Sequence, residues 1–174
     1  AEQQSLTDPR SGLPSGRLIE EQLRRIIQSD GWAFMDVRIN AFSAFTEVYG
    51  FVAGDDVLRF TAILLNEVVN QLGTPEDFIG HVGGSNFILI TAQDRAEAIR
   101  KTLKERFAQE VLAHYNFLDR EQGYLLVTDD SGRTVKVPLM TLAVGMISPK
   151  DHTFADIREI TELAAEARRV DAMT

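Results

Sequence analysis

The chain has 174 residues, of which 44% are hydrophobic and 25% charged, as in an ordinary globular protein. This length fits one domain with its own core, and no apolar run reaches the ~20 residues that a membrane span needs. The net charge of −8 argues against binding to nucleic acid or to an anionic membrane. There is no cysteine, which excludes disulfides and thiolate metal sites and favours a cytoplasmic location.

The N-terminus, Ala1–Ser5, has no basic region followed by an apolar one, so no secretory signal is predicted. The sequence also lacks an initiator methionine. We therefore expect a single domain over residues 1–174, excised from a longer multidomain signalling protein.

The first half of the chain reads as helix, strand, helix and helix. Apolar residues at helical spacing follow Pro14–Ser15, and Gly31 ends this first helix. Residues 32–39 alternate as in a strand, one face of which would carry Asp36, Arg38 and Asn40. A helix over 42–49 comes next, and a longer one starts near Gly54–Asp56, whose acidic residues would suit the helix dipole.

The second half reads as hairpin, helix, hairpin, strand and helix. The expected elements are a hairpin (78–82 and 87–91), a helix (94–112), a second hairpin (123–128 and 134–139), a strand (142–147) and a helix (154–170). The whole order predicts an α+β fold of the ferredoxin-like or palm type, with a mainly antiparallel central sheet flanked by helices. The hairpin around 123–139 is an addition. We expect it to extend the sheet and to present apolar side chains for self-association or a neighbouring domain.

The cluster of basic residues is interpreted as surface, and the set of aromatic residues as core. The basic residues of the helix 94–112 alternate with apolar ones, which indicates a solvated helix face. They are Arg95, Arg100, Lys101, Lys104 and Arg106. The aromatic set is interpreted as core, and it comprises Phe42, Phe45, Tyr49, Phe51 and Phe60.

Five motifs in order resemble the GGDEF family of diguanylate cyclases. Leu6–Pro14 is similar to the opening motif D-x-L-T-G-L-P-N-R, with an altered order in its first half. Gly83–Phe87 (G-G-S-N-F) stands at the hairpin turn that names the family. The other three matches are the spacing of Phe42, Gly50, Gly54 and Asp55, the strand Thr141–Met146, and the closing helix at Leu163–Arg169.

The resemblance implies a catalytic activity and the metal ligands that this activity requires. Family enzymes join two GTP molecules into cyclic di-GMP, each domain of a dimer holding one. Phosphoryl transfer of this kind depends on positioning and on a divalent metal. Magnesium requires oxygen ligands, so carboxylates are expected on the first strand and in the hairpin turn.

Most residues that the resemblance assigns to this chemistry are replaced. The first-strand carboxylate falls at Arg38, and the turn carboxylates fall at Ser85 and Asn86. The guanine-reading asparagine falls at Thr46. Two further changes put Ser43 at the family's lysine and Phe51 at its histidine. The metal site is therefore expected to be absent.

Some nucleotide contacts remain. Asp55 matches the family and would accept hydrogen bonds from guanine, although a role as a first-turn helix residue is equally compatible with its position. The backbone of Gly83 and Gly84 could still approach a phosphate. The inhibitory product site, R-x-x-D, reads Thr74–Asp77 and so lacks its arginine.

Other metal or nucleotide sites are not indicated. Asp36 lies two residues before Arg38, too far along a strand to replace it as a ligand, and is interpreted as a surface residue at the strand end. His81, His114 and His152 have no partner at zinc-binding spacing, so we expect surface or hydrogen-bonded histidines. No P-loop motif is present.

Three functions are compatible with these residues. The first is a catalytically inactive GGDEF signalling module, and the second a GTP-binding regulatory domain without turnover. The third, an active cyclase with a rearranged metal site, is disfavoured by the lost carboxylates. The expected partners are GTP, a neighbouring sensor or receiver domain, and a second copy in a homodimer. No cofactor is expected, except magnesium if GTP still binds.

Overall fold

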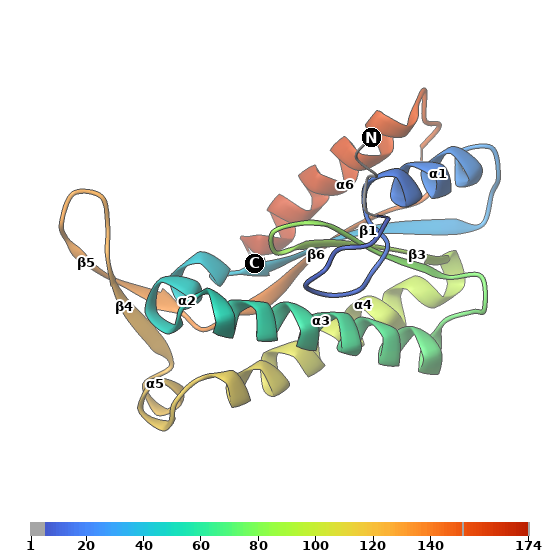
Figure 1. Cartoon of the computed structure of the whole chain (residues 1–174). Helices are drawn as coiled ribbons and strands as arrows, with labels where there is room; N and C mark the ends of the chain where they lie inside the picture. The colour runs from blue at the N-terminus through green and yellow to red at the C-terminus, as the bar shows by residue number, and fades with distance from the viewer. Residues whose placement is uncertain (1–5, 151, 174) are drawn as a thin grey trace, which may run out of the picture.

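A four-stranded antiparallel sheet forms the centre of the protein, in the order β2-β3-β1-β6 (Figure 1). The structure is a computed structural model that describes residues 6–150 and 152–173. The strands are β1 (Trp32–Asn40), β2 (Phe78–Gly83), β3 (Asn86–Ala92) and β6 (Thr141–Ile147). Because β1 pairs with both β3 and β6, it lies inside the sheet and not at an edge.

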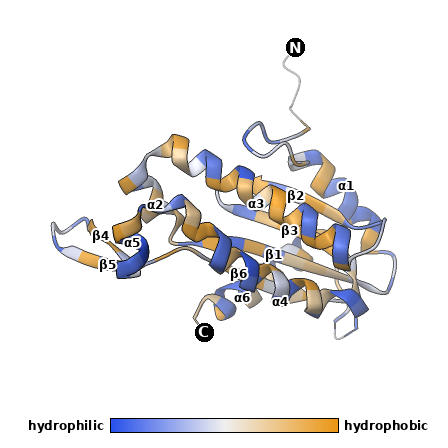
Figure 2. Cartoon of the chain, turned by 90° about the horizontal axis from the view of Figure 1, so that it is seen from below, coloured by the Kyte–Doolittle hydropathy of each residue, from blue (hydrophilic) through white to orange (hydrophobic). Residues whose placement is uncertain are grey.

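Helices cover both faces of this sheet, as Figures 1 and 2 show. One face carries α1 (Gly16–Ile26) and α6 (Ile157–Ala172), and the other α3 (Phe51–Leu72) and α4 (Gln93–Glu110). Alternation along β1 sends Met35 and Val37 into the core with α3 and α4, and Trp32 and Phe34 into the core with α1 and α6. The predicted α+β fold is confirmed. None of the helices described is long and apolar enough to span a bilayer.

The junction between α2 (Phe42–Tyr49) and α3 differs from the expectation. Gly50, with φ of 93°, reverses the chain in one residue, so α3 begins at Phe51. Asp55 therefore lies in the second turn, and the first turn has no acidic residue. The interpretation of Asp55 and Asp56 as helix-dipole partners is wrong.

Side-chain caps determine where the helices α5 (Phe117–Gln122) and α6 begin, and these caps were not recognised from the sequence. The short helix α5 was not predicted and follows the single-turn helix η1 (Val111–His114). Asn116 caps α5 by accepting a hydrogen bond from the Asp119 amide at 2.8 Å, and Gly123 ends it with φ of 85°. Similarly, α6 begins at Ile157 rather than Phe154, because Asp156 caps it.

The added hairpin, β4 (Tyr124–Thr128) and β5 (Thr134–Pro138), forms its own two-stranded sheet. Leu125 is buried and anchors it to the core, whereas the turn projects from the body (Figure 1). The expectation that it extends the central sheet is wrong. The expected exposed apolar side chains are present, with Leu126 54% and Val135 36% exposed.

Side chains already occupy the edge of the central sheet where a further strand would pair. At β6, the Val144 amide donates to Asp171 of α6 at 2.8 Å, and the Val144 carbonyl accepts from Arg100 of α4 at 3.4 Å. Lys104 also binds Asp171. Burial works to raise the pKa of Asp171, but hydrogen bonds from Lys104 and Val144 lower it overall. Arg100 and Lys104 thus protect a strand edge instead of forming part of a purely solvated face.

Candidate functional site

Four segments meet at one end of the sheet: the end of β1, the β2–β3 turn, the start of α2 and the last turns of α6 (Figure 1). Between them lies a depression of about 280 Å³. Its lining includes Arg38, Asn40, Phe42, Ser43, Ser85 and Arg168. The two charged side chains of this lining are arginines, so the depression is suited to an anion.

A buried ion pair forms the base of this region. Asp36 is only 7% exposed, and its Oδ1 lies 3.0 Å from Nε of Arg168. The Asn86 side-chain amide donates to Asp36 Oδ1 at 2.7 Å and to the Val37 carbonyl at 2.9 Å. The interpretation of Asp36 as a strand-end surface residue is wrong: it lies in mid-strand, where desolvation demands a countercharge. Arg168 is a site residue that the sequence analysis missed.

The three positions at which the family's metal carboxylates fall, Arg38, Ser85 and Asn86, lie together. Arg38 is the cross-strand neighbour of Asn86, and the Ser85 carbonyl accepts from the Ile39 amide at 3.1 Å. Their chemistry does not suit magnesium, which requires several oxygen ligands. Arg38 brings positive charge, the Asn86 amide is already bonded, and Asp36 is neutralised by Arg168. Across residues 6–150 and 152–173, no cluster of three or more acidic or histidine side chains could hold a metal ion.

Four predicted nucleotide contacts lie outside this lining: Thr46, Asp55, Gly83 and Gly84. Thr46 donates its hydroxyl to the Ser43 carbonyl at 2.9 Å. Asp55 is half-buried on α3. The hydrogen bond with Asp8 raises the pKa of Arg10, and the charge of Asp55 adds to this effect. Asp55 therefore contributes to the electrostatic environment of Arg10 in the N-terminal loop.

The N-terminal loop is attached to the β2–β3 turn through His81, which is fully buried. Its Nε2 lies 2.8 Å from the Gly84 carbonyl, and its Nδ1 2.8 Å from Ser11 Oγ. Since a carbonyl can only accept, Nε2 carries the proton and Nδ1 accepts from the serine. Burial lowers the pKa of His81, which favours this neutral form. The prediction of a hydrogen-bonded histidine is confirmed here.

The segment Thr74–Asp77, which aligns with the family's inhibitory product site, forms hydrogen bonds within the domain. The Asp77 carboxylate accepts from the Thr74 amide at 3.0 Å, from Thr74 Oγ1 at 2.6 Å and from Thr91 Oγ1 at 2.7 Å. Its oxygens are therefore engaged within the chain. Arg25 of α1 lines a separate depression of about 260 Å³ together with Thr74 and Asp77, so an arginine reaches this surface from a different element.

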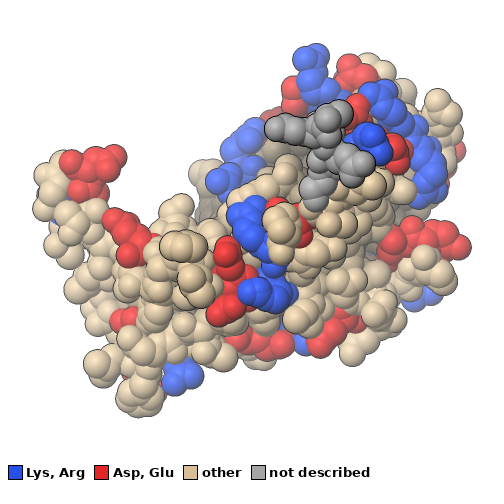
Figure 3. Space-filling view, viewed as in Figure 1, with Lys and Arg blue, Asp and Glu red and all other residues tan. Residues whose placement is uncertain are grey.

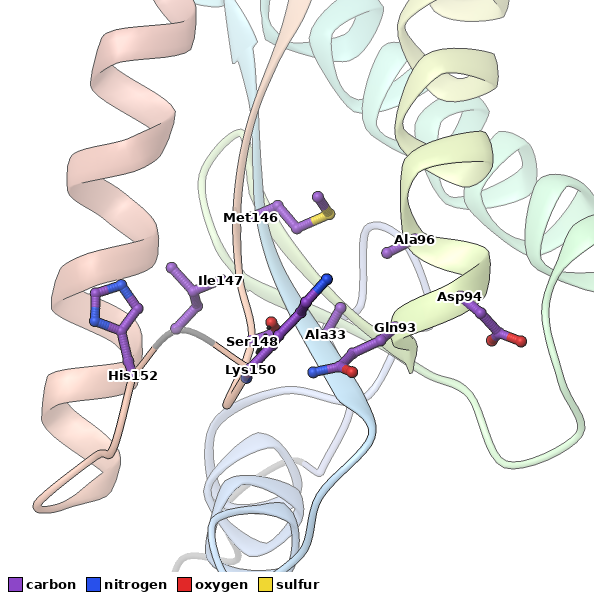
Figure 4. A pocket seen from close by; sticks show the side chains of 9 residues that line it. All are labelled: Ala33, Gln93, Asp94, Ala96, Met146, Ile147, Ser148, Lys150 and His152. Atoms are coloured by element: carbon purple, nitrogen blue, oxygen red, sulfur yellow. Dashed lines mark hydrogen bonds between the residues drawn. The ribbon is translucent and has the colours of Figure 1, made fainter.

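A larger cavity, about 450 Å³, lies at the opposite end of β1 (Figure 4). Its lining residues Asp94, Lys150 and His152 are all exposed, and it contains no buried ion pair. Size alone would select this cavity. The smaller depression is the better candidate because it combines buried charge with the predicted positions.

The aromatic residues mostly pack as predicted. Phe45 is fully buried, and Phe42, Tyr49 and Phe60 pack against the same core. Phe51 is 77% exposed because it begins α3 just after the reversal at Gly50. Its assignment to the core is wrong.

The face of the molecule seen in the space-filling view of Figure 3 carries charges of both signs. The central sheet, its two helix layers and the site at the β2–β3 turn define an α+β domain of the palm type. Residues 5–133 match the family model described as "Diguanylate cyclase, GGDEF domain". The chain therefore belongs to the GGDEF family.

Comparison with known proteins agrees with this membership. The chain is 31% identical over 120 residues to the diguanylate cyclase DgcP of Pseudomonas aeruginosa, covering 66% of this chain and 17% of DgcP. It resembles the diguanylate cyclase SiaD of P. aeruginosa, solved with its activator SiaC, at a TM-score of 0.70 and 18% identity over 97% of this chain and 58% of SiaD. The GGDEF domain of DgcB from Caulobacter crescentus, solved with c-di-GMP, gives a TM-score of 0.67 and 19% identity over 99% and 93% of the chains. The structural likenesses establish the fold.

Proposed function

We propose that this GGDEF domain does not synthesise cyclic di-GMP and serves as a signalling or regulatory module. The observation that carries the proposal is the donor set at the site. Arg38, Ser85 and Asn86 stand where the family resemblance requires carboxylates, and the adjacent Asp36 is paired with Arg168. Without ligands for magnesium, no metal ion would offset the charge that develops on a triphosphate during the reaction.

The proposal also names the domains with which this domain would interact. As a module without turnover, it would act through neighbours, namely a sensor or receiver domain of a longer cytoplasmic chain and a second copy of itself. The exposed apolar side chains of the β4–β5 hairpin, Leu126 and Val135, support a role in such contacts.

We expect no cyclic di-GMP when the purified domain is incubated with GTP and magnesium or manganese. The reason is the missing carboxylate ligands at Arg38, Ser85 and Asn86. Chromatography of a long incubation at high protein concentration measures the product. A diguanylate cyclase of known activity, assayed in parallel, is the positive control. Cyclic di-GMP above a no-protein blank would refute the proposal.

A second candidate function is GTP binding without turnover. The specific observation is the depression of about 280 Å³ beside the start of α2, lined by Arg38 and Arg168. Arginine binds phosphate without metal. Asp55, which matches the family at its guanine contact, would read the base.

In this second candidate, Asp55→Ala should weaken GTP binding roughly tenfold or more, because a charge-assisted hydrogen bond to the base is lost. Calorimetry measures the change. The matched control is Asp56→Ala, the next residue on α3, whose carboxylate is exposed and lies 3.2 Å from Arg59. If GTP binds equally well to both variants, Asp55 has no part in binding guanine.

A further inference from the structure

Two arginine side chains meet at the depression between β1, the β2–β3 turn and α2. Arg38 is exposed there, and no residue within 6–150 or 152–173 forms an ion pair or hydrogen bond with its side chain. A lone exposed arginine is common on protein surfaces. What distinguishes this one is the second arginine beside it.

Arg168 is a buried guanidinium with unused donors. It is 9% exposed and lines the depression. Its Nε lies 3.0 Å from Asp36 Oδ1, yet Nε has no hydrogen-bond partner among the described residues. A guanidinium has five N–H donors, and leaving buried donors unpaired is unfavourable. An anion in the depression would satisfy donors that Asp36 leaves free.

The start of α2 adds neutral donors on the facing wall. Ala41 caps this helix without a side-chain hydrogen bond, and Phe42 and Ser43 line the depression. The first N–H groups of an α-helix have no acceptor within the helix and favour anions. The Ser43 and Ser85 hydroxyls lie on the same lining.

We propose that this depression binds a diphosphate or triphosphate group without metal, and that magnesium weakens the binding. The inference deepens the GTP-binding role and rests on it for the identity of the base. The two guanidinium groups outnumber the single carboxylate of Asp36. A magnesium ion on the phosphates would bring a divalent cation close to them, and like charges at such distances repel. The depression therefore complements a metal-free polyphosphate better than the magnesium complex of the same polyphosphate.

Calorimetric titration of the whole domain tests the metal dependence. The probes are GTP, ATP and inorganic tripolyphosphate, each in EDTA and again in excess magnesium. We expect binding in EDTA and affinity at least several-fold weaker in magnesium. Equal affinity for tripolyphosphate and GTP identifies the phosphate chain as the ligand, whereas a preference for GTP identifies a nucleotide. Binding of none of the three in EDTA, or binding only with magnesium, overturns the proposal.

Variants locate the binding. Arg38→Gln changes an exposed side chain, so the fold is retained, and we expect roughly tenfold weaker binding in EDTA. Arg169→Gln is the matched control, because Arg169 is exposed on α6 and does not line the depression. Unchanged affinity in Arg38→Gln would overturn the site.

The buried arginine needs a different design, because replacing Arg168 alone would leave Asp36 without its countercharge. The double variant Asp36→Leu/Arg168→Met removes the pair together, and urea denaturation checks that it is folded. We expect at least tenfold weaker tripolyphosphate binding. Unchanged affinity in a folded double variant would remove Arg168 from the site. Cyclic di-GMP formation, which requires metal, would refute the proposed inactivity without altering titrations in EDTA.

Discussion

Replacing Gly145 by alanine should lower the free energy of unfolding by about 1–3 kcal/mol, as expected for overpacking in a filled interior. A Cβ at this position of β6 would lie 2.2 Å from the Ala164 carbonyl oxygen and 2.2 Å from the Arg168 amide nitrogen. Both atoms belong to the backbone of α6, so no side-chain rotation relieves the clash and the helix must move. Urea denaturation measures the loss.

Gly80→Ala is the matched control for this change. Gly80 also lies on a strand beneath a helix, but a Cβ there would meet a side chain first, with Cγ1 of Ile19 at 2.7 Å. An isoleucine side chain can shift, so the loss of stability should be smaller than for Gly145→Ala. A larger loss in Gly80→Ala would contradict the close backbone contact between β6 and α6.

Asp36→Ala should destabilise the domain by about 3–5 kcal/mol, because it leaves Arg168 as an uncompensated buried charge. The carboxylate is 7% exposed and Arg168 is 9% exposed, so water cannot replace the lost partner. The loss should depend little on salt, since buried pairs are poorly screened. Urea denaturation at low and high salt measures both quantities.

Replacing the pair together is the informative comparison. Asp36→Leu/Arg168→Met removes both charges, and an apolar substitute for a buried pair is often neutral or stabilising. We expect this double variant to be more stable than Asp36→Ala. Arg38→Ala, at an exposed position on the same strand, should change stability by no more than about 0.5 kcal/mol. A loss below about 1 kcal/mol in Asp36→Ala would mean that the pair is effectively solvated.

Gly145 connects the fold to the site. It is the cross-strand neighbour of Asp36, and the backbone of α6 lies close to the sheet there, at Ala164 and Arg168. The absence of a side chain on Gly145 lets the helix approach closely enough for Arg168 to reach Asp36. A displaced α6 should therefore also weaken the proposed phosphate site.

The sequence by itself determined the order of elements and the family. The signals were local: helical and strand periodicity, the glycines at the β2–β3 turn and the spacing from Phe42 to Asp55. Local patterns of this kind can be read without knowing the tertiary contacts. The replacement of the carboxylate positions by Arg38, Ser85 and Asn86 was also readable directly. The short helix α5 was missed although Asn116 and Gly123 mark its ends.

Only the tertiary structure decided how the remaining charges are used. Asp36 reads as a surface residue until α6 brings Arg168 within 3.0 Å, and Arg100 reads as a solvated cation until Asp171 meets it at the edge of β6. These pairs join elements that are distant in the chain, and no periodicity encodes them. The Asp36–Arg168 pair depends on how closely α6 can approach the sheet, which Gly145 permits. The pairing of the charged groups at the candidate site therefore depends on tertiary packing, whereas the position of the site can be read from the sequence.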